Sequence, residues 1–274
     1  AIARAGARKA CAMLKPVLAA LAFWLAAAST ALAATPHVEA IVTAYSDEQL
    51  IDGFMRTVFG AEDPSQRRGP GANHIRKFPG RVRVHVIDLA RRDHRTGDIR
   101  RFVAKLDRTV KGLKMSMSAD QNRAEMIVFL VDRADYRGVI EETMPRQFNK
   151  RFLISSDCSA VTGGRRGDNL DRAFVFIVVN EGRRAFRHCM IEEISQSLGP
   201  VNDDWRLKES IFNDYSTVSR FNVFDWFILN MLYDRRVKVG MTPRQVERVL
   251  PAAIADARIR LRRIVATGQL SQRR

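Results

Sequence analysis

The sequence predicts an α/β (α+β) protein with a small mixed sheet packed on helices and a helical C-terminal part. Residues 126–131 and 173–179 are uninterrupted apolar runs, which are typical of buried strands. Residues 81–86 alternate between polar and apolar side chains, as expected of a half-buried strand. Helical spacing of apolar residues dominates after residue 183. At 274 residues with 46% hydrophobic content, the chain can bury a substantial core.

The predicted elements of the N-terminal half alternate between helices and strands. Ser46 is the predicted cap of the first helix, because apolar side chains recur at helical spacing after it. Asp98 is the predicted cap of the second helix, whose apolar stripe ends at Leu113. A strand, helix, strand order predicts a crossover unit with parallel strands. The ranges are 46–60 and 98–113 for the helices, and 81–86 and 126–131 for the strands.

The C-terminal half is predicted to hold one more strand and several helices. A polar loop with Cys158 is expected at 155–170, and the strand at 173–179 leads into a helix that Gly199 and Pro200 end. Thr242 and Gln245 form a capping box with proline at the first helical position, and the pattern is interrupted at Pro251. The predicted helices span 132–145, 183–198, 223–233 and the region after 242.

The first 33 residues have the layout of a signal peptide. Four basic side chains and no acidic one precede an apolar run at 17–28 and the small-residue site Ala31-Leu32-Ala33. The run is shorter than the roughly 20 apolar residues that a membrane span needs. We therefore expect cleavage, export to the periplasm or the extracellular space, and no stable transmembrane segment; retention as an anchor is the alternative. Residues 34–274 are expected to form one domain.

The chain is strongly basic, with a formal net charge of +16. Loss of the four basic side chains of residues 1–33 would leave +12. Such a cation is attracted to anionic polymers, membrane surfaces and nucleic acid. Export and the lack of a motif with interleaved basic and aromatic residues argue against nucleic acid. The predicted partner is a peptide or an anionic envelope polymer, and the alternative is a solvated arginine-rich surface.

Two cysteines, Cys158 and Cys189, remain after the expected cleavage. In an oxidising compartment such a pair is most simply a disulfide, which would tie the loop at 155–170 to the helix at 183–198. A redox pair is the alternative, but the Cys-x-x-Cys spacing is missing.

Residues 188–204 carry the candidate functional side chains. On a helix Glu192 and Gln196 are stacked one turn apart, His188 lies one turn earlier, and Glu193 points aside. A zinc site is disfavoured because only His188 supplies an imidazole. A hard-cation or metal-free hydrolytic site would use Glu193 or Glu192 as base, with Asn202, Asp203 and Asp204 nearby. The third interpretation is a structural polar network.

Four motifs in order resemble the bacterial secreted family known as domain of unknown function 2927. The resemblance is best over residues 158–250. The motifs are Cys189-x-x-Glu192-Glu193-x-x-Gln196-x-Leu198-Gly199 with Asn202-Asp203, then Ser210 to Asp214, Asp225 to Tyr233, and Gly240-Met241-Thr242.

That family resembles the zincin metallopeptidases, specifically the matrixins, and the resemblance implies a zincin-like fold with a cleft. It places Glu192, Gln196 and Asn202 at the three histidine ligand positions and Glu193 at the catalytic glutamate. His188, Asp203 and Asp214 would be supporting polar residues. Ser210 to Phe212 resembles the turn beneath the zinc, and Asp225 to Tyr233 the closing helix.

Every ligand histidine is absent, so the resemblance predicts no zinc, no other metal and no cofactor. The functional prediction is a non-catalytic envelope binding or scaffold module, that is, a pseudoenzyme. The alternative is an atypical hydrolase with Glu193 as general base.

Overall fold

The computed structural model describes residues 36–60, 72–146, 148–164, 169–213, 215 and 218–268. Residues 45–259 form one compact unit, and a second unit includes the described residues 36–44 and 260–268. The predicted signal peptide lies outside the described residues, as does Asp214. No helix in the described ranges combines the length and the apolar content needed to cross a membrane.

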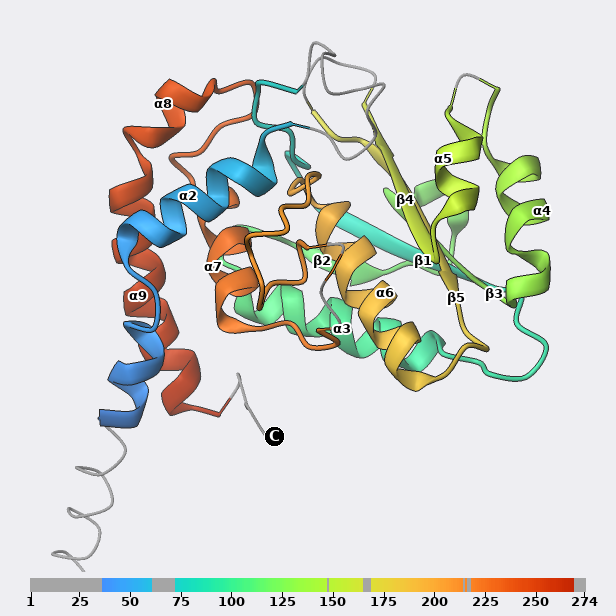
Figure 1. Cartoon of the computed structure of the whole chain (residues 1–274), viewed down its shortest axis with the longest axis horizontal. Coiled ribbons are helices and arrows are strands. Elements are labelled where there is room, and N and C mark those ends of the chain that lie inside the picture. Colours follow the sequence, from blue (N-terminus) through green and yellow to red (C-terminus); the bar gives the residue numbers. More distant parts are fainter. Residues whose placement is uncertain are drawn as a thin grey trace, which may run out of the picture. The chain divides into compact units, whose positions relative to one another are not determined.

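A five-stranded sheet is the centre of the larger unit (Figure 1). Its strand order is β2-β1-β3-β5-β4, in which β2, β1, β3 and β5 run parallel and β4 pairs antiparallel with β5. The mixed sheet confirms the predicted α/β (α+β) class, and the parallel β1–β3 pair confirms the crossover unit. The strands are β1 Val82–Asp88, β2 Met115–Met117, β3 Met126–Val131, β4 Cys158–Gly163 and β5 Arg172–Val178.

Helices cover both faces of this sheet (Figure 1). Helices α4 and α5 lie on one face, and α3 and α6 lie on the other. The helices are α2 Asp47–Val58, α3 Thr96–Thr109, α4 Arg133–Thr143, α5 Lys150–Ser155, α6 Arg183–Gln196, α7 Val223–Leu232, α8 Pro243–Glu247 and α9 Leu250–Ala266, with a short 3₁₀ turn at Gln121–Arg123.

Two of the three predicted helix caps are confirmed. Ser46 forms a capping box with Gln49 at the start of α2, and Thr242 forms one with Gln245 at the start of α8. The predicted cap at Asp98 is wrong, because α3 begins two residues earlier and its N-cap makes no side-chain hydrogen bond. Asp98 lies in the first turn instead and pairs with Arg101 at 2.6 Å.

The polar loop predicted at 155–170 is wrong, because residues 158–163 form the edge strand β4. An edge strand pairs on one side only, so it needs no apolar run or strict alternation. Helix α5 and strand β2 were not expected either, since both are short. The interruption predicted at Pro251 is present just before it, because α8 ends at Glu247 and α9 begins at Leu250; Pro251 lies in the first turn of α9, where the backbone amide that proline lacks would have no helical partner.

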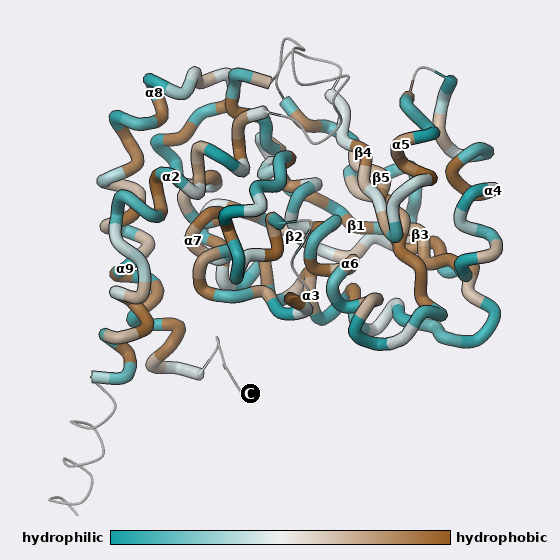
Figure 2. Tube along the Cα trace, viewed as in Figure 1, coloured by the Kyte–Doolittle hydropathy of each residue, from teal (hydrophilic) through white to brown (hydrophobic). Residues whose placement is uncertain are grey.

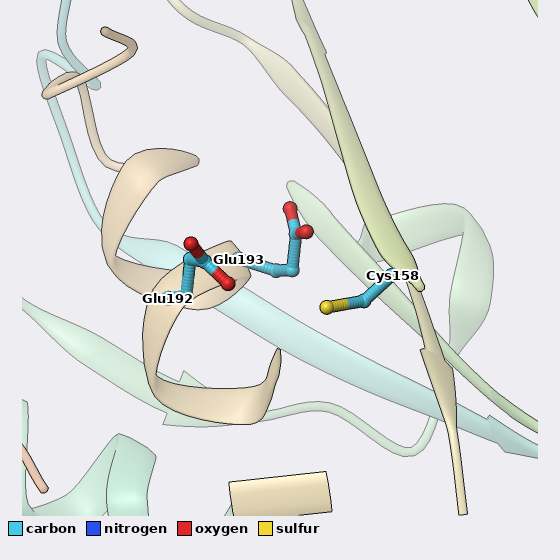
Figure 3. A group of neighbouring side chains, drawn as sticks. All are labelled: Cys158, Glu192 and Glu193. Atoms are coloured by element: carbon cyan, nitrogen blue, oxygen red, sulfur yellow. The ribbon is translucent and has the colours of Figure 1, made fainter. Parts of the chain in front are cut away.

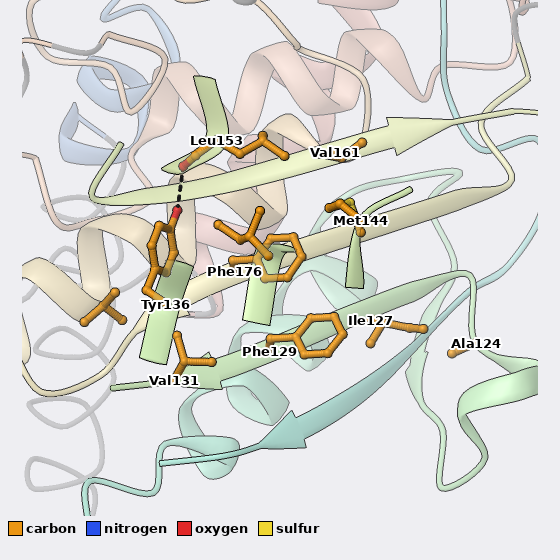
Figure 4. Close-up of a cluster of buried hydrophobic side chains, with 11 residues drawn as sticks. Ala124, Ile127, Phe129, Val131, Tyr136, Met144, Leu153, Val161 and Phe176 are labelled. Carbon is orange, nitrogen blue, oxygen red and sulfur yellow. Dashed lines mark hydrogen bonds between the residues drawn. The ribbon is translucent and has the colours of Figure 1, made fainter. Parts of the chain in front are cut away.

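The core between the sheet and helices α4 and α5 follows from the period-two pattern of β3 (Figure 4). Ile127, Phe129 and Val131 share one face, and the Phe129 ring stacks on Phe176 with centroids 4.9 Å apart. Figure 2 shows hydrophobic residues concentrated in the strands and in α7, whose ten residues are all buried. This packing holds the end of β5 in place, and α6, the helix that carries the candidate site, follows β5 in the chain.

Tyr136 joins three elements at the edge of this core (Figure 4). Its hydroxyl donates to the Leu153 carbonyl oxygen at 3.1 Å and lies 2.8 Å from the hydroxyl oxygen of Ser159. Helices α4 and α5 and strand β4 are thereby held together. Burial is the main cause that raises the pKa of Tyr136, and the Glu193 carboxylate adds to it.

A buried lysine holds the C-terminal end of α7. The Lys77 ammonium donates to the carbonyl oxygens of Leu232 at 2.6 Å and Val237 at 2.7 Å, and it lies 5.3 Å from the centre of the Tyr233 ring. Burial, with a smaller contribution from Lys238, lowers the pKa of Lys77 to about 8. The carbonyl groups that α7 leaves unpaired at its end are satisfied in this way.

The end of α6 approaches the backbone of residue 76 closely. Gly199 has a φ of +134°, and a Cβ there would lie 2.4 Å from the Arg76 carbonyl oxygen. Gly199 was predicted to end the helix, and the structure shows in addition that no larger residue fits at this position.

Candidate functional site

Helix α6 carries the candidate site and is unusually deeply buried for a polar sequence. All residues from Cys189 to Pro200 are buried, and the side chains of Glu192, Glu193 and Gln196 are only 6–7% exposed. Burial of charged and amide groups is costly unless they are paired. The polar partners of these side chains therefore decide what the helix can do.

His188 and Glu192 form the first pair of the site. His188 Nε2 lies 3.1 Å from Glu192 Oε2, and His188 Nδ1 lies 2.7 Å from the Val218 carbonyl oxygen. A carbonyl oxygen can only accept, so the Nδ1 hydrogen points to Val218. A hydrogen bond between His188 Nε2 and Glu192 Oε2 then requires one further proton, which is carried either by the imidazole or by the carboxyl group. The predicted stacking of the two side chains is thus a direct contact.

Glu193 lies beside the disulfide. Figure 3 shows its side chain extending from α6 toward the strand that carries Cys158, while Glu192 leaves the helix in another direction. Ligand atoms of Cys158, Glu192 and Glu193 lie within 4.8 Å of one another, the separation expected of residues that could hold a metal ion. Cys158 is bonded to Cys189, however, which confirms the predicted disulfide. A disulfide sulfur offers no thiolate, so two carboxylates remain.

Gln196 and Asn202 have separate partners. The Gln196 amide nitrogen donates to both carboxylate oxygens of Asp203, at 2.9 Å each. The Asn202 side chain donates to the Arg56 carbonyl oxygen at 2.7 Å, and its backbone amide donates to the Thr57 carbonyl oxygen at 3.0 Å. Asn202 therefore caps the end of α2. Its side-chain nitrogen therefore serves the scaffold.

Asp204 anchors the segment that follows. Arg206 Nε donates to its Oδ1 at 2.7 Å, and Arg56 Nη1 donates to its Oδ2 at 3.2 Å. Hydrogen bonding from Arg206, with help from Arg56, lowers the pKa of Asp204 to about 2. The backbone amide of Asp204 also donates to the Phe212 carbonyl oxygen at 3.1 Å. The loop after α6 is thus attached both to α2 and to the turn at residues 210–212.

A fully buried carboxylate, Asp225, holds that turn against α7. Asp225 Oδ1 accepts from the Ser210 hydroxyl at 2.7 Å and from the Ile211 amide at 3.1 Å, while Oδ2 accepts from the Asn222 amide at 3.0 Å. Desolvation raises the pKa of Asp225 to about 6, although these hydrogen bonds oppose the shift. The turn that the resemblance places beneath a zinc ion is thus anchored by a carboxylate.

The structure brings some of the predicted site residues together and separates others. His188, Glu192 and Glu193 meet beside the disulfide, Gln196 meets Asp203, and Asn202 turns to α2. The role of Asp225 as an anchor was not predicted, although Asn222-x-x-Asp225 has the spacing of a capping box. Arg56 was also missed, since a contact with Asp204 across 148 positions leaves no local pattern.

The fold and the site define a mixed α/β protein whose central helix carries a buried network of carboxylate and amide groups. The chain belongs to the family described as protein of unknown function (DUF2927), whose model matches residues 47–252. No curated protein and no solved structure matches the chain.

Proposed function

We propose that this chain is an exported, non-catalytic, zincin-like binding module of the cell envelope, which takes a peptide or an anionic polymer as its partner. The observation that carries the proposal is the state of the three positions assigned to ligand histidines. Glu192 pairs with His188, Gln196 donates to Asp203, and Asn202 donates to the end of α2. Side chains engaged in this way serve as scaffold. The mixed sheet, α6, the anchored turn and α7 follow in the order that the resemblance to the zincins implies, which supports the zincin-like part of the proposal.

Export is supported by composition and by the disulfide. The basic, apolar and small-residue regions follow one another in residues 1–33, and the two remaining cysteines are paired. We expect protein recovered from the envelope fraction to begin at Ala34. Intact-mass measurement of the full-length chain expressed in a bacterial host checks this. A mass that retains residues 1–33 would contradict cleavage and favour the anchored form.

A hydrolase that uses Glu193 as general base is the second candidate. The observation that favours it is the buried Glu192 and Glu193 pair, whose carboxylate oxygens lie within 4.8 Å of each other. Two carboxylates this close in a buried site favour retention of a proton by one of them, which is one way to obtain a general acid or base. His188 beside Glu192 could exchange a proton with that pair.

Glu193→Gln separates the two candidates. The binding-module proposal predicts that the variant hydrolyses peptide and polysaccharide substrates no more slowly than wild type, because no hydrolysis depends on Glu193. The measurement is turnover of fluorogenic peptides and cell-wall glycan, together with the melting temperature. Glu142→Gln is the matched control, since it makes the same change at an exposed glutamate of α4, outside the candidate site.

Loss of a wild-type activity in Glu193→Gln, with an unchanged melting temperature, would replace the binding module by the hydrolase. Elemental analysis of protein purified without chelator gives a second check. Stoichiometric zinc would contradict the assignment of Glu192, Gln196 and Asn202 as scaffold, and His188 would then be the first ligand to test.

A further inference from the structure

The disulfide and two glutamates of α6 form one buried cluster of sulfur and carboxyl groups. One ligand atom each of Cys158, Glu192 and Glu193 lies within 4.8 Å of the other two, and all three residues are buried. Figure 3 shows the Cys158 sulfur pointing from its strand toward the helix that carries both glutamates. Cys189 is bonded to Cys158 and precedes Glu193 by one helical turn, so it belongs to the same cluster. Two elements, β4 and α6, thus bring two sulfurs and two carboxyl groups together.

The two carboxyl groups are arranged as metal-ligating carboxylates are. Two buried carboxylates this close repel each other, and a cation between them removes the repulsion. His188 Nε2 lies 3.1 Å from Glu192 Oε2, and the His188 ring is itself held by the Val218 carbonyl oxygen. A carboxylate has two oxygens, so Glu192 can keep this contact and bind a cation as well. Such outer partners orient the ligands of a metal ion.

A buried hydroxyl group beside the cluster is unsatisfied. Ser197 is fully buried, and its Oγ makes no hydrogen bond within the described part of the chain. The backbone of Ser197 is still helical, and the residue lies one turn after Glu193 on the same face of α6. Helical side chains lean toward the N-terminus of the helix, so this hydroxyl is directed toward the Glu193 carboxyl group. Because an unsatisfied buried hydroxyl is costly, it points to a second state of the cluster in which Ser197 has a partner.

We propose that reduction of the disulfide turns this cluster into a zinc site. Its ligands are Cys158, Cys189, Glu192 and Glu193. The oxidised protein offers two carboxylates and no thiolate, whereas the reduced protein adds two thiolates, which favour zinc over the oxygen-seeking magnesium and calcium ions. Four protein ligands fill a tetrahedral shell and leave no position for a reacting water, so the ion is structural. The inference goes beyond the proposed function, because neither the binding partner nor the absence of hydrolysis depends on it.

The reductant is a dithiol. One of its thiolates attacks a sulfur of the disulfide, the other cysteine leaves as a thiolate, and the second thiol of the reductant then resolves the mixed disulfide. Two electrons pass to the cysteines, the reductant becomes a disulfide, and zinc displaces the two thiol protons. Access is short, because β4 is an edge strand and the side chain of Asp157, the residue before Cys158, is 94% exposed.

The test uses the full chain with Cys11→Ser, so that the two cysteines of the disulfide are the only thiols. The protein is reduced with dithiothreitol, freed of it by gel filtration without oxygen, and titrated with zinc chloride against a chromophoric chelator. We expect one tightly bound zinc ion per reduced chain and none per oxidised chain. Cobalt(II) in place of zinc should give the charge-transfer absorption of thiolate ligands and the visible bands of a tetrahedral site.

Glu193→Gln should weaken zinc binding by the reduced chain about tenfold or more, because an amide oxygen is a poorer ligand than a carboxylate. Glu142→Gln is the matched control, since Glu142 is exposed on α4 and its replacement should leave the affinity unchanged. Glu192→Gln/Glu193→Gln keeps both thiols and measures the affinity of the two cysteines alone. Far-UV circular dichroism verifies that each variant is folded.

Equal zinc affinity in wild type and in the double glutamine variant would overturn the site and show binding by a bare dithiol. Zinc binding by the oxidised chain with the affinity of the reduced one would overturn the dependence on reduction. The urea midpoint of the reduced chain is measured with and without zinc, and it should rise with zinc because an ion that binds the folded state stabilises it. A midpoint that zinc leaves unchanged would also overturn the proposal. The hydrolysis assays on the oxidised protein test the proposed function separately.

Discussion

Replacement of Asp225 by alanine should lower the free energy of unfolding by about 3 kcal/mol at neutral pH, because it leaves three buried donors without an acceptor. The donors are the Ser210 hydroxyl and the amides of Ile211 and Asn222. Urea unfolding followed by far-UV circular dichroism measures the loss. Asp52→Ala is a matched control, since Asp52 is exposed and pairs with Arg56 across the surface of α2.

Asp225 should also make stability depend on pH. Its folded pKa of about 6 lies above the ordinary value of 3.8, so the native state binds the proton more tightly than the unfolded chain between these values. The stability that protonation of Asp225 adds is therefore fully present below about pH 4 and is lost as the pH rises through 6, whereas the hydrogen bonds to Ser210, Ile211 and Asn222 remain. The difference amounts to about 3 kcal/mol, since one pKa unit corresponds to about 1.4 kcal/mol.

Asp225→Asn isolates this effect because the amide keeps an oxygen for Ser210 and Ile211 but does not titrate. The free energy of unfolding of wild type relative to Asp225→Asn should rise by about 2–3 kcal/mol between pH 7 and pH 4. Urea titrations at intervals of half a pH unit measure it. A difference that stays constant across this range would show that Asp225 does not retain a proton in the fold.

Loss of the Cys158–Cys189 disulfide is the second large effect we expect. The bridge closes a loop over a sequence separation of 31, which corresponds to about 3–4 kcal/mol in the chain-entropy description. It also joins the edge strand β4 to α6, beside Glu193. The Cys158→Ser/Cys189→Ser variant should unfold at correspondingly lower urea concentration, and reduced wild type should unfold like it.

The control for this experiment is the double serine variant measured with and without reductant. Its midpoint should not move, whereas that of wild type should fall on reduction. Equal midpoints for oxidised and reduced wild type would contradict a stabilising role. A difference of two mass units between the reduced and oxidised intact protein verifies that the bridge is present in the sample.

Local patterns predicted the interior of the sheet and most of the helices. Strands β3 and β5 are apolar on both faces because helices cover both, and this leaves a continuous run in the sequence. Strand β4 has a neighbour on one side only, so its sequence keeps Ser159 and Thr162 among small residues. The cap of α3 was misplaced because Asp98 is favourable anywhere in a first turn.

In the candidate site, too, contacts within a helix were predictable and contacts between distant segments were not. The contact between His188 and Glu192 follows from helical spacing, and it was predictable. The anchors of the surrounding loops were not, because Asp204 meets Arg56 and Asp225 meets Ser210 only once the chain has folded. Helical spacing predicts which side chains lie on one face, but only the folded loops determine which of these side chains are hydrogen-bonded to the rest of the protein.

The buried ammonium of Lys77 has a consequence for motion. It holds the carbonyl oxygens of Leu232 and Val237 at the same time, so neither the segment around residue 77 nor the end of α7 can detach without stranding charged or polar groups. Tyr233, which packs against Lys77, donates in turn to the Leu198 carbonyl oxygen. The segment at residue 77, the end of α6 and the end of α7 should therefore open as one cooperative unit during native-state fluctuations.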